Sequence, residues 1–113
     1  MGFLNIFRSK TPQAVLVYLD GQNLSAEVYE TCDLATLEEL LTPILEESGV
    51  GEYDGEEAGS SETCLFLYGA DAEQLFSTIE PVLKSYPLCS GARVVVRRGG
   101  PGAAQRELRL PVV

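Results

Sequence analysis

Two short apolar runs restrict this chain of 113 residues to a small set of folds. Residues 14–19 (AVLVYL) and residues 63–68 (TCLFLY) are almost continuously apolar and rich in residues that favour strands. Both are much shorter than the about 18 apolar residues that a transmembrane helix requires, so we predict no transmembrane segment. A strand whose residues do not alternate with polar ones is buried on both faces. The two runs therefore predict two central strands of one sheet.

Two helical patterns alternate with these strands. Between residues 33 and 48, apolar residues recur at intervals of three and four, as on the buried side of a helix. Asp33 is placed to cap the start of this helix and Gly49 to end it. Residues 71–85 repeat the pattern. Pro43 lies inside the first helix, where we expect a kink or a break because proline removes a backbone donor.

Three weaker segments complete the pattern. Residues 51–59 are strongly acidic and weakly patterned, which favours an exposed edge strand. Residues 92–98 and 106–110 flank a glycine-rich turn and are predicted to pair as a hairpin. After the first strand, we expect a loop that contains a short helical turn capped by Ser25.

The resulting order of elements is strand, helix, strand, repeated once and followed by an extra strand. This is the split βαβ arrangement of ferredoxin-like α+β domains. Right-handed crossovers and two central apolar strands leave one antiparallel sheet, in the order 4-1-3-2, with both helices on one face. The extra C-terminal strand then lies beside strand 4. We therefore predict a single ferredoxin-like domain over residues 14–113.

Residues 1–13 form a short amphipathic segment and linker before this domain. Large apolar residues make up most of its first part: Phe3, Leu4, Ile6 and Phe7. One short helical turn binds a membrane only weakly. Packing of this segment on the domain, or on a second copy of the chain, is therefore favoured over membrane contact.

The charges are segregated along the chain. It has 17 Asp and Glu residues against 8 Lys and Arg residues, and every charged residue between Lys10 and Lys84 is acidic. In the predicted sheet, acidic residues lie at the edge formed by strand 2 and arginines at the opposite edge. We predict these residues as partner-binding sites: Glu52, Asp54, Glu56 and Glu57 at one edge, and Arg93, Arg97 and Arg98 at the other. The edges lie about 15–20 Å apart, which exceeds the screening length of about 8 Å at physiological salt.

The residue types present restrict the chemistry. The chain has no His, and Cys32, Cys64 and Cys89 show no Cys-x-x-Cys spacing, so a zinc site of the usual kinds is not expected. An odd number of cysteines is typical of reduced thiols in the cytoplasm. Cys89, close to Arg93 in sequence, has the most electropositive surroundings of the three. We predict no catalytic residue, no metal site and no cofactor.

A short stretch resembles a known family. Residues 51–55 (GEYDG) are similar to the Glu-Tyr-Asp-Gly-Trp stretch of the ribonuclease E inhibitor family, also called regulator of ribonuclease activity B, although Glu56 stands where that family has Trp. Members of that family are small acidic bacterial proteins built around a ferredoxin-like domain. The resemblance implies a regulatory role through protein binding and assigns no site residue.

These observations favour a cytoplasmic interaction or regulatory module without catalytic activity over an enzyme. The acidic strand 2 and the first helix are expected to bind a basic protein partner. The arginine hairpin serves self-association as a homodimer or binds a second, acidic partner. The net charge of −9 excludes nucleic acid as a partner for the whole surface, because phosphate binding needs a cationic surface.

One alternative remains open at this point. The uncovered face of the sheet would form a small anionic-ligand-binding domain or an enzyme, with Arg93 or Arg97 gripping the anion. A closed pocket of about 300 Å³ or more that contains an inward-pointing arginine would favour this alternative.

Overall fold

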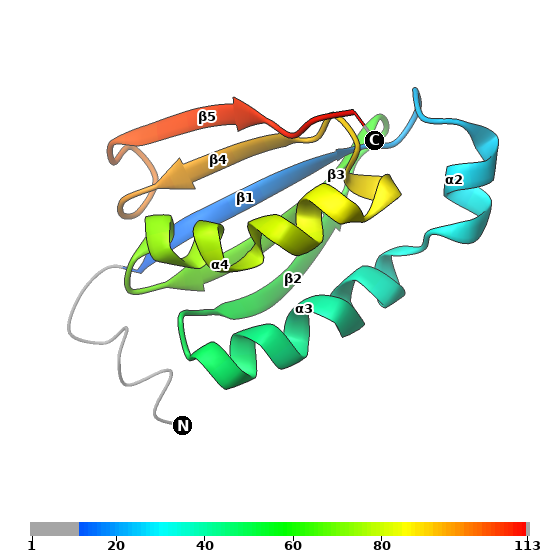
Figure 1. The fold of residues 1–113 in the computed structure, drawn as a ribbon. Coiled ribbons are helices and arrows are strands. Elements are labelled where there is room, and N and C mark those ends of the chain that lie inside the picture. Colours follow the sequence, from blue (N-terminus) through cyan, green and yellow to red (C-terminus); the bar gives the residue numbers. More distant parts are fainter. Residues whose placement is uncertain (1–11, 113) are drawn as a thin grey trace.

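The computed structural model describes residues 12–112. The amphipathic segment was expected over residues 1–13, and its residues 1–11 lie outside the described range. The elements run in the order β1 (Gln13–Asp20), α2 (Ala26–Thr31), α3 (Leu34–Ser48), β2 (Glu52–Ala58), β3 (Glu62–Gly69), α4 (Ala72–Ser85), the 3-10 helix η1 (Pro87–Cys89), β4 (Arg93–Arg97) and β5 (Gln105–Arg109). Figure 1 shows α3 and α4 side by side over one face of the sheet.

The five strands form one antiparallel sheet in the order β2-β3-β1-β4-β5. Counted from the opposite edge, strand 5 lies beside strand 4, followed by strands 1, 3 and 2. The predicted α+β class is confirmed. β1 and β3 occupy the central positions, as their continuous apolar runs predict, and the acidic β2 lies at an edge.

Helix α3 begins and ends where its sequence predicts. The Asp33 side chain accepts a hydrogen bond from the Thr36 amide at 2.8 Å, and Gly49 ends the helix in a left-handed conformation with φ of 70°. The helix continues through Pro43, so the break that we allowed for there does not occur. Leu41 and Leu45 on either side of Pro43 are buried, and this packing stabilises the helix despite the missing backbone donor.

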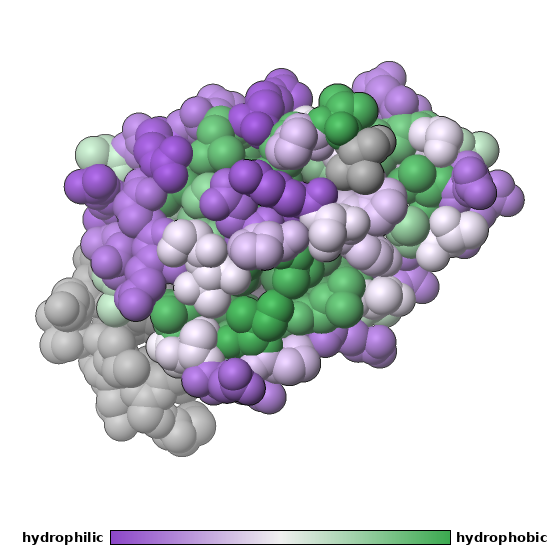
Figure 2. Space-filling view, in the orientation of Figure 1, coloured by the Kyte–Doolittle hydropathy of each residue, from purple (hydrophilic) through white to green (hydrophobic). Residues whose placement is uncertain are grey.

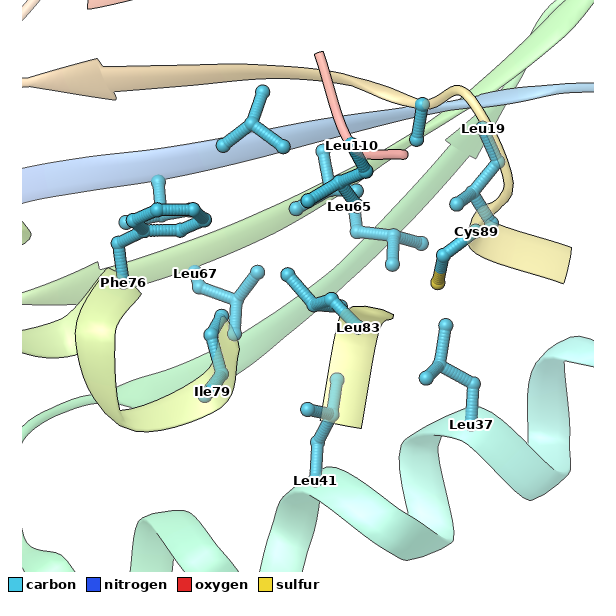
Figure 3. Packing of buried hydrophobic residues seen from close by; sticks show 14 of the residues in the cluster. Leu19, Leu37, Leu41, Leu65, Leu67, Phe76, Ile79, Leu83, Cys89 and Leu110 are labelled. Carbon is cyan, nitrogen blue, oxygen red and sulfur yellow. The ribbon is translucent and has the colours of Figure 1, made fainter. Parts of the chain in front are cut away.

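The hydrophobic core lies between the helices and one face of the sheet. Figure 3 shows side chains of α3, α4 and the strands converging from both layers. The fully buried members include Leu37 and Leu41 from α3, Leu75, Ile79 and Leu83 from α4, and Val15, Val17, Leu65, Leu67, Val94 and Val96 from the strands. Because successive strand residues point to opposite faces, these strand positions define the covered face of the sheet.

Two hydrogen bonds join elements that are distant in sequence. The Tyr86 hydroxyl donates to the backbone carbonyl of Asp33 at 2.7 Å, which links the end of α4 to the start of α3. The Gln13 side-chain carbonyl accepts from the Ala72 amide at 2.9 Å, which links β1 to the first turn of α4. The first bond fixes the two helices relative to each other. The second fixes α4 relative to the sheet, at an amide that the start of a helix leaves without an intrahelical partner.

The other face of the sheet carries a second, smaller apolar cluster. Its buried members are Ala14, Leu16, Cys64 and Val95, and the half-buried rings of Tyr18, Phe66 and Tyr68 pack against them. None of the described helices contributes to this cluster. We call this side the open face.

The described helices are short. The longest, α3, has 15 residues, and over residues 12–112 no helix combines the length and apolar character needed to span a bilayer.

On the helical side, Figure 2 shows apolar surface over α3 framed by hydrophilic residues, and Leu40 of α3 is 43% exposed.

Candidate functional site

A groove between α3 and β2 contains Glu52, one of the partner-binding residues predicted from the sequence. It has a volume of about 460 Å³ and is lined by Glu38, Thr42, Leu45, Glu46, Gly49, Gly51, Glu52 and Tyr53. Gly49 ends α3 and turns the chain directly into β2, so the last turns of the helix lie beside the first residues of the strand. The groove therefore results from the tight connection between the two elements.

Gly51 is required where it stands. A Cβ atom there would lie 2.6 Å from the Tyr68 carbonyl oxygen and 2.9 Å from the Leu75 Cδ1 atom. No side chain fits without moving the backbone, because real Cβ atoms do not approach other atoms this closely. The glycine lets the start of β2 lie directly against β3 and α4, and Gly51 itself lines the groove.

The groove is acidic. Glu38, Glu46 and Glu52 line it, and none of its described lining residues is basic. Burial raises the pKa of the Tyr53 hydroxyl, and the neighbouring carboxylates of Glu56 and Glu38 raise it further. The Tyr53 hydroxyl donates to the Glu56 Oε1 atom at 2.6 Å. These negative charges oppose the deprotonation of Tyr53, which remains a hydrogen-bond donor at neutral pH.

The acidic surface continues along α3. A second cavity of about 460 Å³ is lined by Ala35, Glu38, Glu39, Thr42 and Pro43, and it shares Glu38 and Thr42 with the groove. Together the two cavities follow the exposed side of the helix from Ala35 to Glu46, which is about three turns. This length suits an extended segment of a partner better than a compact small molecule.

The four acidic residues predicted on β2 do not form one cluster. The register shifts between Tyr53 and Gly55, so Asp54 is the extra residue of a β-bulge. Glu56 pairs with Leu65 and faces the helices, whereas Glu52 and Glu57 pair with Tyr68 and Cys64 and lie on the open side. Glu52 begins the edge strand and also borders the groove. An extra residue in a strand reverses the alternation beyond it.

Two of the three predicted arginines, Arg93 and Arg97, already bind groups of their own chain. Arg93 stacks on the Tyr18 ring at 3.9 Å from its centroid and forms ion pairs with Glu62 at 3.2 Å and Glu107 at 3.4 Å. The Arg97 Nε atom donates to the Gly99 carbonyl at 2.8 Å. Arg93 therefore chiefly connects β1, β3, β4 and β5 of its own sheet.

The remaining arginines divide between the two sides of the hairpin. Arg98 is exposed just beyond β4, beside Arg106 on the helical side. The Arg106 guanidinium donates to both carboxylate oxygens of Glu73, at 2.7 and 2.8 Å. This bidentate contact lowers the pKa of Glu73 and joins β5 to the first turn of α4. Arg109 donates to the Gly91 carbonyl at 3.2 Å.

The anionic-ligand alternative has little geometric support. The cavity that contains arginines on the open face has a volume of about 240 Å³, below the about 300 Å³ of typical small-molecule sites. Its lining includes Asp20 and Glu62 together with Arg93 and Arg109, so the charges are mixed. The carboxylate of Asp20 has a lowered pKa, chiefly because the Gln22 and Asn23 amides donate to it, and it stays negative at neutral pH.

Two of the three cysteines, Cys64 and Cys89, are buried, and Cys32 is partly exposed. Cys89 is fully buried, and burial raises its pKa to about 12. The position of Cys89 near Arg93 in sequence does not give it an electropositive, exposed setting, because η1 directs it into the core (Figure 3). Burial also raises the pKa of Cys64. Within residues 12–112, no three Cys, Asp or Glu side chains lie close enough to hold a metal ion.

The sequence predicted that the first helix belongs to the acidic surface, but the glutamates of this helix that line the groove were not predicted. Glu38 and Glu46 lie eight positions apart, which places both on nearly the same side of a helix. That spacing was visible in the sequence. The approach of Tyr53 to Glu38 and Glu56 was not, because it depends on the turn at Gly49 and on the bulge.

Comparison of the chain with protein-family models, with curated proteins and with solved structures gave no match. The resemblance of residues 51–55 to the ribonuclease E inhibitor family therefore stays a prediction from sequence. These residues cover the start of β2, the bulge and one wall of the groove.

Proposed function

We propose that this ferredoxin-like α+β domain is a cytoplasmic protein-interaction or regulatory module without catalytic activity, and that its partner places a basic segment in the groove between α3 and β2. The observation that carries the proposal is the groove of about 460 Å³ with Glu38, Glu46 and Glu52 in its lining. The resemblance to the ribonuclease E inhibitor family supports a regulatory role and assigns no residue.

The lining of the groove suits lysine and arginine side chains. Leu45 and Tyr53 offer apolar surface for the aliphatic part of such a side chain, and the carboxylates lie at its rim. An exposed ion pair contributes only about 0.2–1 kcal/mol. Several pairs along α3 are therefore needed, and a partner with a single basic residue would bind too weakly.

The net charge of the chain should raise the rate at which a basic partner associates as well as the affinity of the complex. The net charge of −9 attracts a basic partner over longer distances and speeds its approach. Contacts of this kind between exposed charges are screened by salt. We expect binding of a basic partner to be strong at low salt and largely lost at about 0.5 M salt.

The location can be tested by nuclear magnetic resonance. An isotope-labelled sample is titrated with a nine-residue peptide that alternates lysine and glycine, and amide shifts are followed. We expect the largest changes at Gly49, Gly51 and Tyr53, because these residues line the groove. A peptide of equal length with glutamate in place of lysine is the matched control and should cause no shift.

Two results would overturn the proposal. In one, the lysine peptide shifts the exposed acidic helix α2 as strongly as the groove, which would indicate attraction to negative charge without a site. In the other, the peptide causes no localised shift at low salt.

A further inference from the structure

The open face is divided into three stripes that run parallel to the strands. The acidic stripe consists of Glu52 and Glu57 on β2, and the cationic stripe consists of Arg93 and Arg97 on β4. Beyond the cationic stripe, β5 carries Glu107 and Arg109 on the same face, and Glu107 pairs with Arg93. Between the acidic and cationic stripes lies the apolar stripe on β3 and β1, made up of Tyr68, Phe66, Cys64, Ala14, Leu16 and Tyr18. The strand register places these residues in rows across the sheet, with Glu52, Tyr68, Ala14 and Arg97 in one row and Glu57, Cys64, Tyr18 and Arg93 in another.

The apolar stripe is unusual for a sheet face that no described helix covers. An antiparallel sheet with one solvated face normally alternates apolar and polar residues along its central strands. Here β1 and β3 carry apolar residues on both faces, and the rings of Tyr18, Phe66 and Tyr68 remain partly exposed. A rim of charge around exposed apolar surface is typical of a protein interface.

We propose that a second copy of this chain packs face to face on the open face, with the two-fold axis parallel to the strands. Rotation about such an axis exchanges the two edges of the sheet, so the acidic stripe of one copy lies over the cationic stripe of the other. Rotation about an axis across the strands would place acid over acid and arginine over arginine. Charge complementarity therefore selects one of the two symmetric arrangements.

The register favours an axis that passes between β1 and β3. With this axis, Glu52 faces Arg97 of the partner subunit, and Glu57 faces Arg93 of the partner subunit. Arg93 already forms ion pairs with Glu62 and Glu107 within each chain, so the pair of Glu52 and Arg97 is the main charge contact between the subunits. Phe66 then packs on Leu16 of the partner subunit, so apolar residues meet across the centre. Packed sheets lie about 10 Å apart and cross at about −30°, and glutamate and arginine side chains are long enough to pair across that gap.

The area of the open face sets the expected affinity of the two subunits for each other. The axis between β1 and β3 places β2, β3, β1 and β4 over the partner subunit; these four strands span about 15 Å, and their paired length is about 20 Å. The resulting footprint of about 300 Å² for each subunit is smaller than the about 800 Å² of a standard interface. We therefore expect a weak dimer, with a dissociation constant of about 10–100 µM.

Charge exchange tests the arrangement directly. Sedimentation velocity of the full chain at low salt, from 1 to 500 µM as a rough range, is compared for the unaltered chain, Glu52→Arg, Arg97→Glu and the double variant. Each single variant replaces two symmetric ion pairs by like charges and should weaken self-association about tenfold or more. The double variant restores both pairs and should return the dissociation constant to within about threefold.

A matched control comes from the neighbouring residue. Arg98 is exposed and lies on the helical side of the hairpin, so Arg98→Glu changes the net charge equally but leaves the open face intact. It should not change self-association. Circular dichroism verifies that each variant is folded. If Arg97→Glu disturbs the fold, the Glu52→Arg variant alone tests the arrangement, because Glu52 is exposed and its replacement leaves the fold intact.

Three results would overturn the proposal. The first is a chain that stays monomeric up to about 500 µM, because the open face then has another occupant such as residues 1–11 or a different protein. The second is a dimer that both single variants leave unchanged. The third is a double variant that remains as weak as the single variants. Arg97→Glu alters no residue that lines the groove, so its effect on self-association tests the dimer independently of the groove.

Discussion

The two edges of the sheet use their charges differently. At the β2 edge, Glu38, Glu46 and Glu52 line a groove without a basic residue among its described lining. At the β4–β5 edge, Arg93 and Arg106 each contact carboxylates of the same chain. The arginines therefore hold the hairpin to the sheet and to α4, whereas the glutamates remain accessible. Separation of the charges along the sequence produces one structural edge and one edge suited to binding.

The largest effect is expected from Gly51→Ala at the acidic edge. The added Cβ would lie 2.6 Å from the Tyr68 carbonyl and force β2 away from its neighbours. We expect the free energy of unfolding to fall by about 3 kcal/mol, measured by urea denaturation. Gly49→Ala meets no atom within 4 Å and suffers only from its φ of 70°, so it should cost about 1 kcal/mol. Equal costs would contradict the close approach at Gly51.

Arg93→Ala tests whether the basic edge is structural. The variant removes a ring contact with Tyr18 and ion pairs with Glu62 and Glu107. The free energy of unfolding should fall by about 1 kcal/mol. Arg98→Ala, at an exposed position, serves as the control and should change it by less than about 0.5 kcal/mol. Denaturation at a protein concentration well below the expected dimer range keeps self-association out of the measurement.

Loss of charge at the acidic edge should not lower the free energy of unfolding, in contrast to the loss expected for Arg93→Ala. Glu38→Gln combined with Glu46→Gln removes two negative charges from a surface that lacks compensating bases. We expect stability to remain within about 0.5 kcal/mol of the original or to rise slightly, because repulsion between the carboxylates falls. A loss of more than about 1 kcal/mol in urea denaturation would show that these glutamates serve the fold instead of binding.

The smallest effect concerns the pH dependence of the Glu73–Arg106 contact. The Arg106 side chain lowers the pKa of Glu73 in the folded state. A lowered carboxylate pKa contributes stability above the unfolded pKa, and this contribution is lost as pH falls through the folded pKa. In Arg106→Ala, the pKa of Glu73 should rise toward its ordinary value. Titration followed at the Glu73 carboxyl carbon measures this directly, and an unchanged pKa would contradict the contact.

The sequence predicted the features that depend on local pattern. The apolar runs of β1 and β3 placed these strands at the centre, and Asp33 and Gly49 marked the ends of α3. The acidic character of β2 marked it as an edge strand, because a central strand cannot bury so many carboxylates.

The features that the sequence could not predict depend on backbone geometry and distant contacts. The bulge at Asp54 sends Glu56 to the helical side and Glu57 to the open side, and Gly55 adopts φ of 130° beside it. The burial of Cys89 depends on η1, a single 3-10 turn without a sequence signal as strong as a helical period. The partners of Arg93 and Arg106 lie 31 and 33 residues away and meet only in the folded chain.

The most direct test compares two variants of equal charge. Isothermal titration with the lysine–glycine peptide is performed on the unaltered chain, on Glu38→Lys with Glu46→Lys in the groove, and on Glu27→Lys with Glu30→Lys on the exposed surface of α2. If the groove is the binding site, the first pair should weaken binding at least about tenfold and the second no more than about twofold. Equal weakening by both pairs would show that the peptide senses only net charge, and this result would contradict a binding site between α3 and β2.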